Sequence, residues 1–413
     1  MKKQSTLAIE TSCDDTSIWI INFDWNTFTV EKILAYSQVQ EHNQFGGVVP
    51  EIASRLHSEK IIAVLSQIWR DKIQNVDSIS VTTHPGLPWS LVVWKTVASL
   101  LWEYFNKPII SVDHIVWHIF ALFLERSIHE IKFPMVILTA SWWHNNIYHV
   151  SEKNTDKHPS LTERGEGGDL KQQTQHRWTY QITQIWQTLD DAAWECFDKV
   201  SRMLGWPYPW WVRISQQAKL WKPNKKFELN RIRLSHDEFN FSFSGVKSQI
   251  HHLINKCRTE SVIASETKWQ RGNLFTDSVI ASKTKLERGN PFTETEIQDI
   301  AFEFQESVVE VLAKKLIRAA LKYWAKTIWL SGWVSANDRL QEYILELLQN
   351  KQRLKNQSSF ICHSDPEWNE GEESIKESIE EFTKNFQPQL LTPTKKLYCT
   401  DNAAMIWVAW ILK

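Results

Sequence analysis

Apolar residues in the first third of the chain recur in short runs, separated by polar turns and by longer segments with helical spacing. Short apolar runs bounded by turn residues predict strands, and apolar positions three and four residues apart predict helices. The predicted strands of this first block are residues 7–10, 17–23, 30–37, 78–82 and 109–112. Its predicted helices are residues 50–70, 90–105 and 114–124.

A second block with a similar order of elements follows. Its predicted strands are residues 135–139, 146–150, 180–184 and 327–330. Its predicted helices are residues 189–204, 297–323, 337–348 and a last helix from Asn402. Each half opens with antiparallel strands and ends in crossover helices, which predicts an α/β protein with a cleft between two lobes.

We expect an N-terminal lobe at residues 1–131 and a C-terminal lobe at residues 132–413. The second lobe carries three polar stretches that we interpret as inserted loops, at about residues 151–178, 258–295 and 349–388. Long surface loops add little closure entropy, so these insertions need not disturb the core.

The second insertion contains a tandem duplication. Ser261–Asp277 reads SVIASETKWQRGNLFTD and recurs almost intact as SVIASKTKLERGNPFTE at Ser278–Glu294. Two copies of a unit this short are too few for a solenoid. We therefore expect passive material in a surface loop.

The composition is unusual in having 23 tryptophans and only 12 glycines. Ordinary usage would give roughly 29 glycines, at about 7% of residues. Several tryptophans stand in turn contexts that favour glycine, as in Trp142-Trp143 and Trp210-Trp211. Our hypothesis is that many are glycines in the functional protein, from a UGA codon that the source organism reads as glycine. The alternative is an aromatic surface for single-stranded nucleic acid.

The charge and cysteine content narrow the class of protein. The formal net charge of −1 gives no overall basic field, so a nucleic-acid partner needs a local patch or a helper subunit. The five cysteines form no CxxC pair, which argues against a disulfide framework or a structural zinc site. No signal-peptide segment and no apolar run of membrane-spanning length is present, so we expect a cytoplasmic protein.

Two histidines are candidate metal ligands. His114 and His118 stand four residues apart at the start of a predicted helix, so their side chains share one face and could bind a metal through two imidazoles. Asp401 is a further candidate ligand. It also stands where the N-cap of the last helix is expected, and capping is its alternative role.

Two turns could bind phosphate. The sequence from Glu10 to Asp15 joins two predicted strands, and its hydroxyls and amides could contact phosphate oxygens, although a simple polar turn would look alike. Ser141-Trp142-Trp143-His144 has the same place in the second half. With glycine at both tryptophans it becomes a loop whose amides could approach a phosphate.

Ten segments resemble those of one known family and occur in the family's order: IETSCDDTS, FGGVVPEIASRLHSEKI, PGLPWS, SVDHIVWH, SWWH, TLDDAAWECFDKV, YPWW, FNFSFSGVK, SGWVSAN and CTDNAAMI. On these segments, from Ile9 to Ile406, the chain resembles the tRNA threonylcarbamoyladenosine biosynthesis transferases, the TsaD family. Tryptophan is the main departure. It stands at positions where the family usually has glycine: Trp89, Trp94, Trp117, Trp142, Trp143, Trp186, Trp194, Trp210, Trp211 and Trp333.

The resemblance implies a two-lobed actin-like ATPase fold (RNase H-like) with duplicated βββαβα-type domains. It implies transfer of a threonylcarbamoyl group from threonylcarbamoyl-AMP to N6 of adenosine at tRNA position 37, in tRNAs that read codons starting with A. By the same resemblance, His114, His118 and Asp401 are ligands of one divalent metal, iron or zinc, and Asp14 is catalytic. The implied pocket for ATP or the adenylate is lined by Thr139, Ala140, Ser141, Trp142, Trp143, Asp198, Trp211 and Asn337.

The implied protein partners are a paralogous scaffold subunit and a small ATPase subunit, with no membrane. Three other classes remain open: a metalloprotease, an ATPase or kinase of the same fold, and the non-catalytic scaffold paralogue itself. The metalloprotease lacks support because Ile115 follows His114, so no HExxH motif supplies a glutamate as general base.

Overall fold

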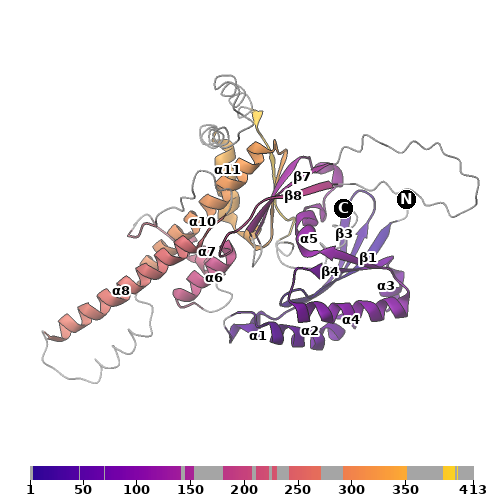
Figure 1. Cartoon of the computed structure of the whole chain (residues 1–413), viewed down its shortest axis with the longest axis horizontal. Helices are drawn as coiled ribbons and strands as arrows, with labels where there is room; N and C mark the ends of the chain where they lie inside the picture. Colours follow the sequence, from indigo (N-terminus) through magenta and orange to yellow (C-terminus); the bar gives the residue numbers. More distant parts are fainter. Residues whose placement is uncertain are drawn as a thin grey trace, which may run out of the picture.

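The computed structural model of the chain contains two five-stranded sheets with helices packed against them (Figure 1). The structure describes residues 3–45, 47–68, 70–140, 145–152, 180–206, 211–222, 226–229, 241–270, 292–350, 385–395 and 398. No helix in these ranges is long and apolar enough to cross a membrane.

The first sheet has the strand order β3-β2-β1-β4-β5. β1 to β3 are antiparallel, whereas β4 and β5 run parallel to β1. The strands are β1 (Gln4–Glu10), β2 (Asp15–Phe23), β3 (Phe28–Ser37), β4 (Ser78–His84) and β5 (Ile109–Asp113). The loop after β1 therefore lies at the end of the sheet where the carboxyl ends of the parallel strands β1, β4 and β5 meet.

The second sheet repeats this arrangement, with the order β8-β7-β6-β9-β10 and the same parallel and antiparallel pairs. Its strands are β6 (Met135–Ala140), β7 (Asn145–Glu152), β8 (Tyr180–Trp186), β9 (Thr327–Ser331) and β10 (Gln389–Leu391). The duplicated α/β architecture of an actin-like fold is thus confirmed. The sequence pattern missed only β10, whose three residues are too short to show a period.

The helices of each half cover one face of their sheet (Figure 1). In the first half these are α1 (Val39–Asn43), α2 (Pro50–Leu65), α3 (Arg70–Asn75) and α4 (Pro88–Phe105). In the second half they are α6 (Ala193–Met203), α7 (Trp211–Lys219), α8 (Ser244–Gln270), α10 (Glu294–Lys322) and α11 (Asp338–Gln349). The predicted helix 50–70 ends early, at Leu65, and α1, α3, α7 and α8 were not predicted.

Besides the apolar core between helices and sheet in each half, another cluster of buried apolar residues joins the two halves. Alternate residues of a strand point to opposite faces, so Leu7 and Ile9 pack under the first-half helices while Ala8 faces the other half. On β6, Ile137 faces the same joint. Between the sheets lies α5 (His114–Phe120), followed by the 3₁₀ turns Ala121–Phe123 and Ile128–Glu130 (Figure 1). The predicted helix 114–124 is therefore shorter than expected, because its last turn tightens.

The first part of the duplicated segment is helical. Residues 261–270, from the first copy, continue helix α8, which corrects the expected loop there. Residues 271–291 lie outside the described part of the chain. Among the α8 residues whose burial the structure describes, Val246, Ile250 and Ile254 are buried, and the far end of the helix projects from the body (Figure 1).

Deletion of Ser261–Asp277 is expected to leave the melting temperature and the activity near the parent values, because the described residues that it removes, 261–270, lie at the projecting end of α8. Thermal unfolding of the deletion variant and the parent measures this. A fall of several degrees, or loss of activity, would show that the segment packs against the body.

Two tryptophans occupy backbone conformations that favour glycine. Trp25 in the β2–β3 turn has φ 73° and Trp324 has φ 52°. Trp324 follows the C-cap of α10, and its amide donates to Leu321 O at 3.3 Å while the next amide, of Ala325, donates to Ala320 O at 2.9 Å. This pair of bonds defines a Schellman motif, whose left-handed residue is usually glycine. The geometry supports the glycine hypothesis at these positions.

Three buried indoles also lack the polar partner that a buried tryptophan usually has. The Nε1 atoms of Trp19, Trp94 and Trp117 form no hydrogen bond within the described part of the chain. By contrast, Trp221 donates to Asp299 Oδ1 at 2.9 Å and stacks on Phe302. The described surroundings of the first three therefore provide no hydrogen-bond acceptor for the indole N–H.

Candidate functional site

The two predicted metal ligands lie together at the joint between the lobes. His114 and His118 project from α5, with ring centroids 4.8 Å apart and ring planes almost perpendicular. His114 is 8% exposed and His118 is fully buried. The predicted common face is thus confirmed by the geometry, and the pair presents imidazoles toward one region.

Trp117 lies against both rings. Its indole stacks on His118 at 4.1 Å and meets His114 edge-on at 4.2 Å. A large side chain therefore occupies the space beside the pair. Glycine at this position would open that space without changing either histidine.

The start of α5 is fixed by Asp113. Its Oδ1 accepts hydrogen bonds from the amides of Ile115 and Val116, at 2.8 and 3.0 Å, and so caps the helix. Its Oδ2 lies 2.9 Å from Nε2 of His84, at the end of β4. Asp113 therefore orients the turn that carries His114 and is not itself aimed at the histidine pair.

The loop after β1 approaches His114 from the N-terminal lobe. Oγ of Ser12 lies 3.3 Å from Nδ1 of His114. The Glu10 carboxylate accepts from the Ser12 amide and from the Thr82 hydroxyl. Asp14 follows in the same loop, is partly exposed, and its backbone carbonyl accepts from the Gln38 amide at 3.2 Å.

A buried histidine supports this loop from behind. Nε2 of His57 donates to the Cys13 carbonyl at 2.9 Å, and Nδ1 accepts from the Thr16 hydroxyl at 2.7 Å. Burial lowers the pKa of His57 to about 4, against the opposing effect of the Cys13 carbonyl. His57 is therefore neutral in the folded chain at neutral pH.

The free energy of unfolding is expected to fall as the pH drops from about 6.5 to about 4, by up to roughly 3 kcal/mol from His57. In this window the unfolded chain binds a proton at His57 and the folded chain does not. Chemical denaturation at pH 7 and pH 4.5 measures the difference. His57→Gln should flatten the slope, and an unchanged slope in that variant would contradict the assignment.

The second predicted phosphate loop begins where β6 ends. Thr139 and Ala140 are its last strand residues and are buried. The Thr139 hydroxyl and the side-chain amide of Asn145, the first residue of β7, are buried without a hydrogen bond among the described residues. Ser141, Trp142 and Trp143 lie outside that part of the chain. Two residues with unsatisfied polar groups thus stand on either side of residues 141–144 in the chain.

Gly332 approaches this strand end closely. It has φ +80°, and a Cβ built on it would lie 2.5 Å from the Ala140 carbonyl oxygen. Only glycine fits here. The close contact brings the turn after β9 to the start of the loop.

Two other predicted pocket residues come from neighbouring helices. Asp198 is 5% exposed on α6. Trp211 is the first residue of α7, and its side chain is outside the described residues. An expected ligand pocket thus draws on α6 and α7 as well as on the two sheets.

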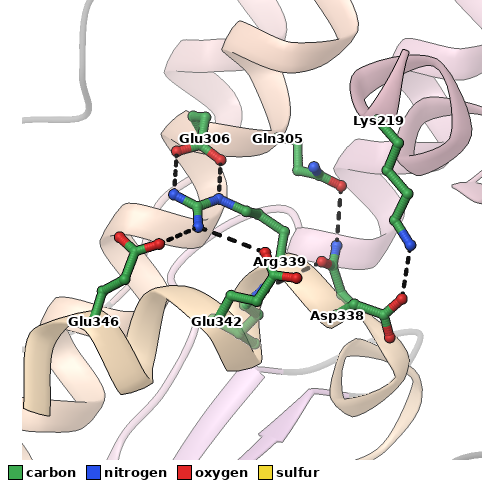
Figure 2. Close-up of polar contacts among 9 residues, drawn as sticks. Lys219, Gln305, Glu306, Asp338, Arg339, Glu342 and Glu346 are labelled. Atoms are coloured by element: carbon green, nitrogen blue, oxygen red, sulfur yellow. Dashed lines mark hydrogen bonds and ion pairs between the residues drawn. The ribbon is translucent and has the colours of Figure 1, made fainter. Parts of the chain in front are cut away.

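Asn337, also predicted to bind the nucleotide, is the N-cap of α11. Its Oδ1 accepts from the Leu340 amide at 3.2 Å, and its Nδ2 donates to Gln305 on α10 at 3.3 Å. Figure 2 shows the adjacent Arg339 forming two bonds with Glu306. The Asn337 side chain therefore caps α11 through Oδ1 and joins α11 to α10 through Nδ2.

The third predicted metal ligand, Asp401, lies outside the described residues, as does the predicted helix from Asn402. Among the described residues, no group of three or more His, Cys, Asp or Glu side chains is arranged as a metal site. The histidine pair supplies two nitrogen donors on one helix face, a set that suits iron or zinc.

Sequence reasoning missed Ser12 and Ser331 as neighbours of the histidines. The Ser331 hydroxyl donates to the His118 carbonyl at 2.6 Å. Each serine stands in a motif used for the family resemblance, but no local spacing connects it to α5. Their role depends on how the sheets bring distant segments together.

A family model described as tRNA N6-adenosine threonylcarbamoyltransferase matches residues 29–161 and 172–361. A protein of that name from Syntrophomonas wolfei is 32% identical over 403 residues, covering 97% of this chain and 89% of its own length. One from Bacillus thuringiensis is 31% identical, covering 99% and 91%.

Two solved structures share weaker similarity. Full-length HypF in a phosphate- and nucleotide-bound form is 10% identical, covers 99% of this chain and 55% of its own, and has a TM-score of 0.45. YeaZ from Pseudomonas aeruginosa is 13% identical, covers 36% of this chain and 59% of its own, and has a TM-score of 0.23.

Proposed function

The chain belongs to the tRNA N6-adenosine threonylcarbamoyltransferase family, and we propose that it transfers a threonylcarbamoyl group from threonylcarbamoyl-AMP to N6 of adenosine 37 of tRNA. The observation that carries the proposal is the extent of the match, which covers 97% of the chain and includes both lobes and the histidine pair. A scaffold protein or a kinase of similar fold has no need for that buried pair.

The proposed chemistry is an acyl transfer. N6 of the adenine forms a bond to the carbamoyl carbonyl carbon, and the bond from that carbon to the phosphate oxygen breaks. AMP leaves with the electron pair as a phosphate anion, and the proton on N6 passes to a base. We assign Asp14 as this base, because its carboxylate is in the partly exposed loop that also contacts His114.

The substrate pocket in this proposal lies between the two phosphate loops. The buried Thr139 hydroxyl and the loop of Ser141, Trp142 and Trp143 would bind the adenylate, with Asp198 and Trp211 at its side. Asn337 would contribute through the position of the α11 N-terminus, since both polar atoms of its side chain are already engaged.

His114 and His118, with Asp401, would hold one divalent metal, iron or zinc. When bound there, the metal would polarise the carbamoyl carbonyl and stabilise the charge that develops on its oxygen. The two imidazoles on one face of α5 fit this role. The protein itself fixes the pair through α5 and excludes water by burying it.

The proposed protein partners are a paralogous scaffold subunit and a small ATPase subunit, acting with tRNA in the cytoplasm. On α4, the side chains of Val92, Leu100 and Tyr104 are exposed, and their helical spacing places them on one side of the helix. Monomeric proteins rarely expose large contiguous apolar patches. This side of α4 is the surface we assign to the scaffold subunit.

Label is expected to enter a tRNA that reads codons starting with A, when the chain is supplied with threonylcarbamoyl-AMP labelled in its threonine. A matched tRNA with guanosine at position 37 lacks the acceptor amine at N6 and should remain unlabelled. Acid-precipitated tRNA counts measure both. Label in the guanosine tRNA, or none in either when the partner subunits are present, would contradict the proposed reaction.

A further inference from the structure

Each histidine of the pair is held by a serine from a different lobe. We propose that Ser12 and Ser331 are positioning residues that fix His114 and His118 for metal binding. The proposal rests on the metal site of the proposed function and extends it to residues outside the ligand set.

Ser12 acts on the His114 ring. Its hydroxyl oxygen lies 3.3 Å from Nδ1, and the residue is 3% exposed. Because the hydroxyl contacts Nδ1, we assign the metal to Nε2 of the ring. Metal-bound histidines usually make such a second bond, which fixes the tautomer and the ring orientation.

Ser12 is itself held firmly. Its amide donates to the Glu10 carboxylate, and its carbonyl accepts from the Leu87 amide at 2.8 Å. A Cβ built on Gly86 would lie 2.9 Å from Ser12 Cβ, so the neighbouring backbone closes over it. The hydroxyl therefore has a fixed place relative to the N-terminal sheet.

Ser331 acts on the backbone of His118. Its hydroxyl donates to the His118 carbonyl at 2.6 Å. α5 ends at Phe120, so this carbonyl is among the last four, which lack a partner within an α-helix. Ser331 is the last residue of β9 and pairs with Thr139 in the sheet. It therefore ties the histidine to the strand that leads into the second phosphate loop.

The two serine contacts come from different lobes. The N-terminal lobe fixes the ring of His114, and the C-terminal lobe fixes the backbone of His118. The relative position of the imidazoles therefore depends on both lobes, and loss of either hydroxyl should weaken metal binding without removing a ligand.

The test is metal affinity of the purified full chain, titrated with Zn²⁺ against a competing chelator, and the absorption spectrum with Co²⁺. Ser12→Ala and Ser331→Ala are each expected to weaken Zn²⁺ binding by about 10- to 100-fold and to change the Co²⁺ spectrum. Ser90→Ala is the matched control, since its buried hydroxyl has no hydrogen bond among the described residues. It should bind as the parent does.

Parent-like affinity in Ser12→Ala or Ser331→Ala would overturn the role of that serine and leave the proposed reaction untouched. A parent chain that binds no metal would overturn the metal site as well. Imidazole ¹⁵N NMR of the metal-free parent requires no variant. A proton on Nδ1 of His114 supports the proposal, and a proton on Nε2 overturns it.

Discussion

Alanine at His114 or His118 is expected to abolish metal binding and to lower threonylcarbamoyl transfer by roughly a thousandfold. The expected size follows from a metal that contributes several kcal/mol to the transition state, at about 1.4 kcal/mol for each factor of ten. Removal of one imidazole from the pair on α5 takes away a donor that no described neighbour replaces. Metal content by mass spectrometry and the tRNA labelling assay measure the two effects separately.

His149→Ala is the matched control for this experiment. His149 is partly buried on β7 and stacks on Tyr323, so its loss removes a packed ring away from the site. It should leave metal content and transfer near the parent values. Full transfer by a metal-free double variant of His114 and His118 would refute the metal site.

Glycine at all 23 tryptophan positions is expected to turn an insoluble or inactive chain into a soluble one that binds ATP or the adenylate. A bulky residue in a left-handed or strained conformation costs about 1–3 kcal/mol, and a whole domain is stable by only about 5–15 kcal/mol. Trp25 and Trp324 have such conformations, and Trp117 fills the space beside the histidine pair. Several such sites together exceed what the fold can absorb.

Two single variants test the glycine hypothesis, and their expected changes in melting temperature have opposite signs. Trp324→Gly should raise the melting temperature, because the Schellman motif of α10 favours glycine. Trp221→Gly should lower it, because this indole loses its bond to Asp299 and its stacking on Phe302. TGA codons at the tryptophan positions of the gene would directly establish the glycine hypothesis. Equal nucleotide affinity of the two full chains, by calorimetry, would refute it and favour the aromatic-surface alternative.

Much of the fold could be predicted from local pattern. The strands of both sheets except β10 were expected within a few residues, since their buried apolar runs stand out against polar turns. The pairing of His114 with His118 also needed no tertiary information, because residues four apart on a helix share a face. The abundance of tryptophan in turns pointed to glycine before any backbone angle was known.

The ends of helices and the contacts between distant segments were harder to predict from the sequence. α8 reaches Gln270 through residues that resemble a loop in composition, and α5 stops at Phe120 although its apolar period continues. The cap that Asn337 forms on α11 and its bond to Gln305 were not predicted, and its place at the nucleotide stays a prediction. The end of α5 depends on the joint between the lobes, and the contacts of Asn337 depend on packing against α10, neither of which a local sequence window contains.

The sequence by itself therefore determined the order of the elements, the family and the histidine pair, because each is encoded in neighbouring residues or in motif order. Only the tertiary structure decided that Ser12 and Ser331 meet that pair from opposite lobes. The reason is physical. Strand order and register bring the ends of β1 and β9 to the same helix, and contacts between segments so far apart in the chain arise only when both sheets have formed.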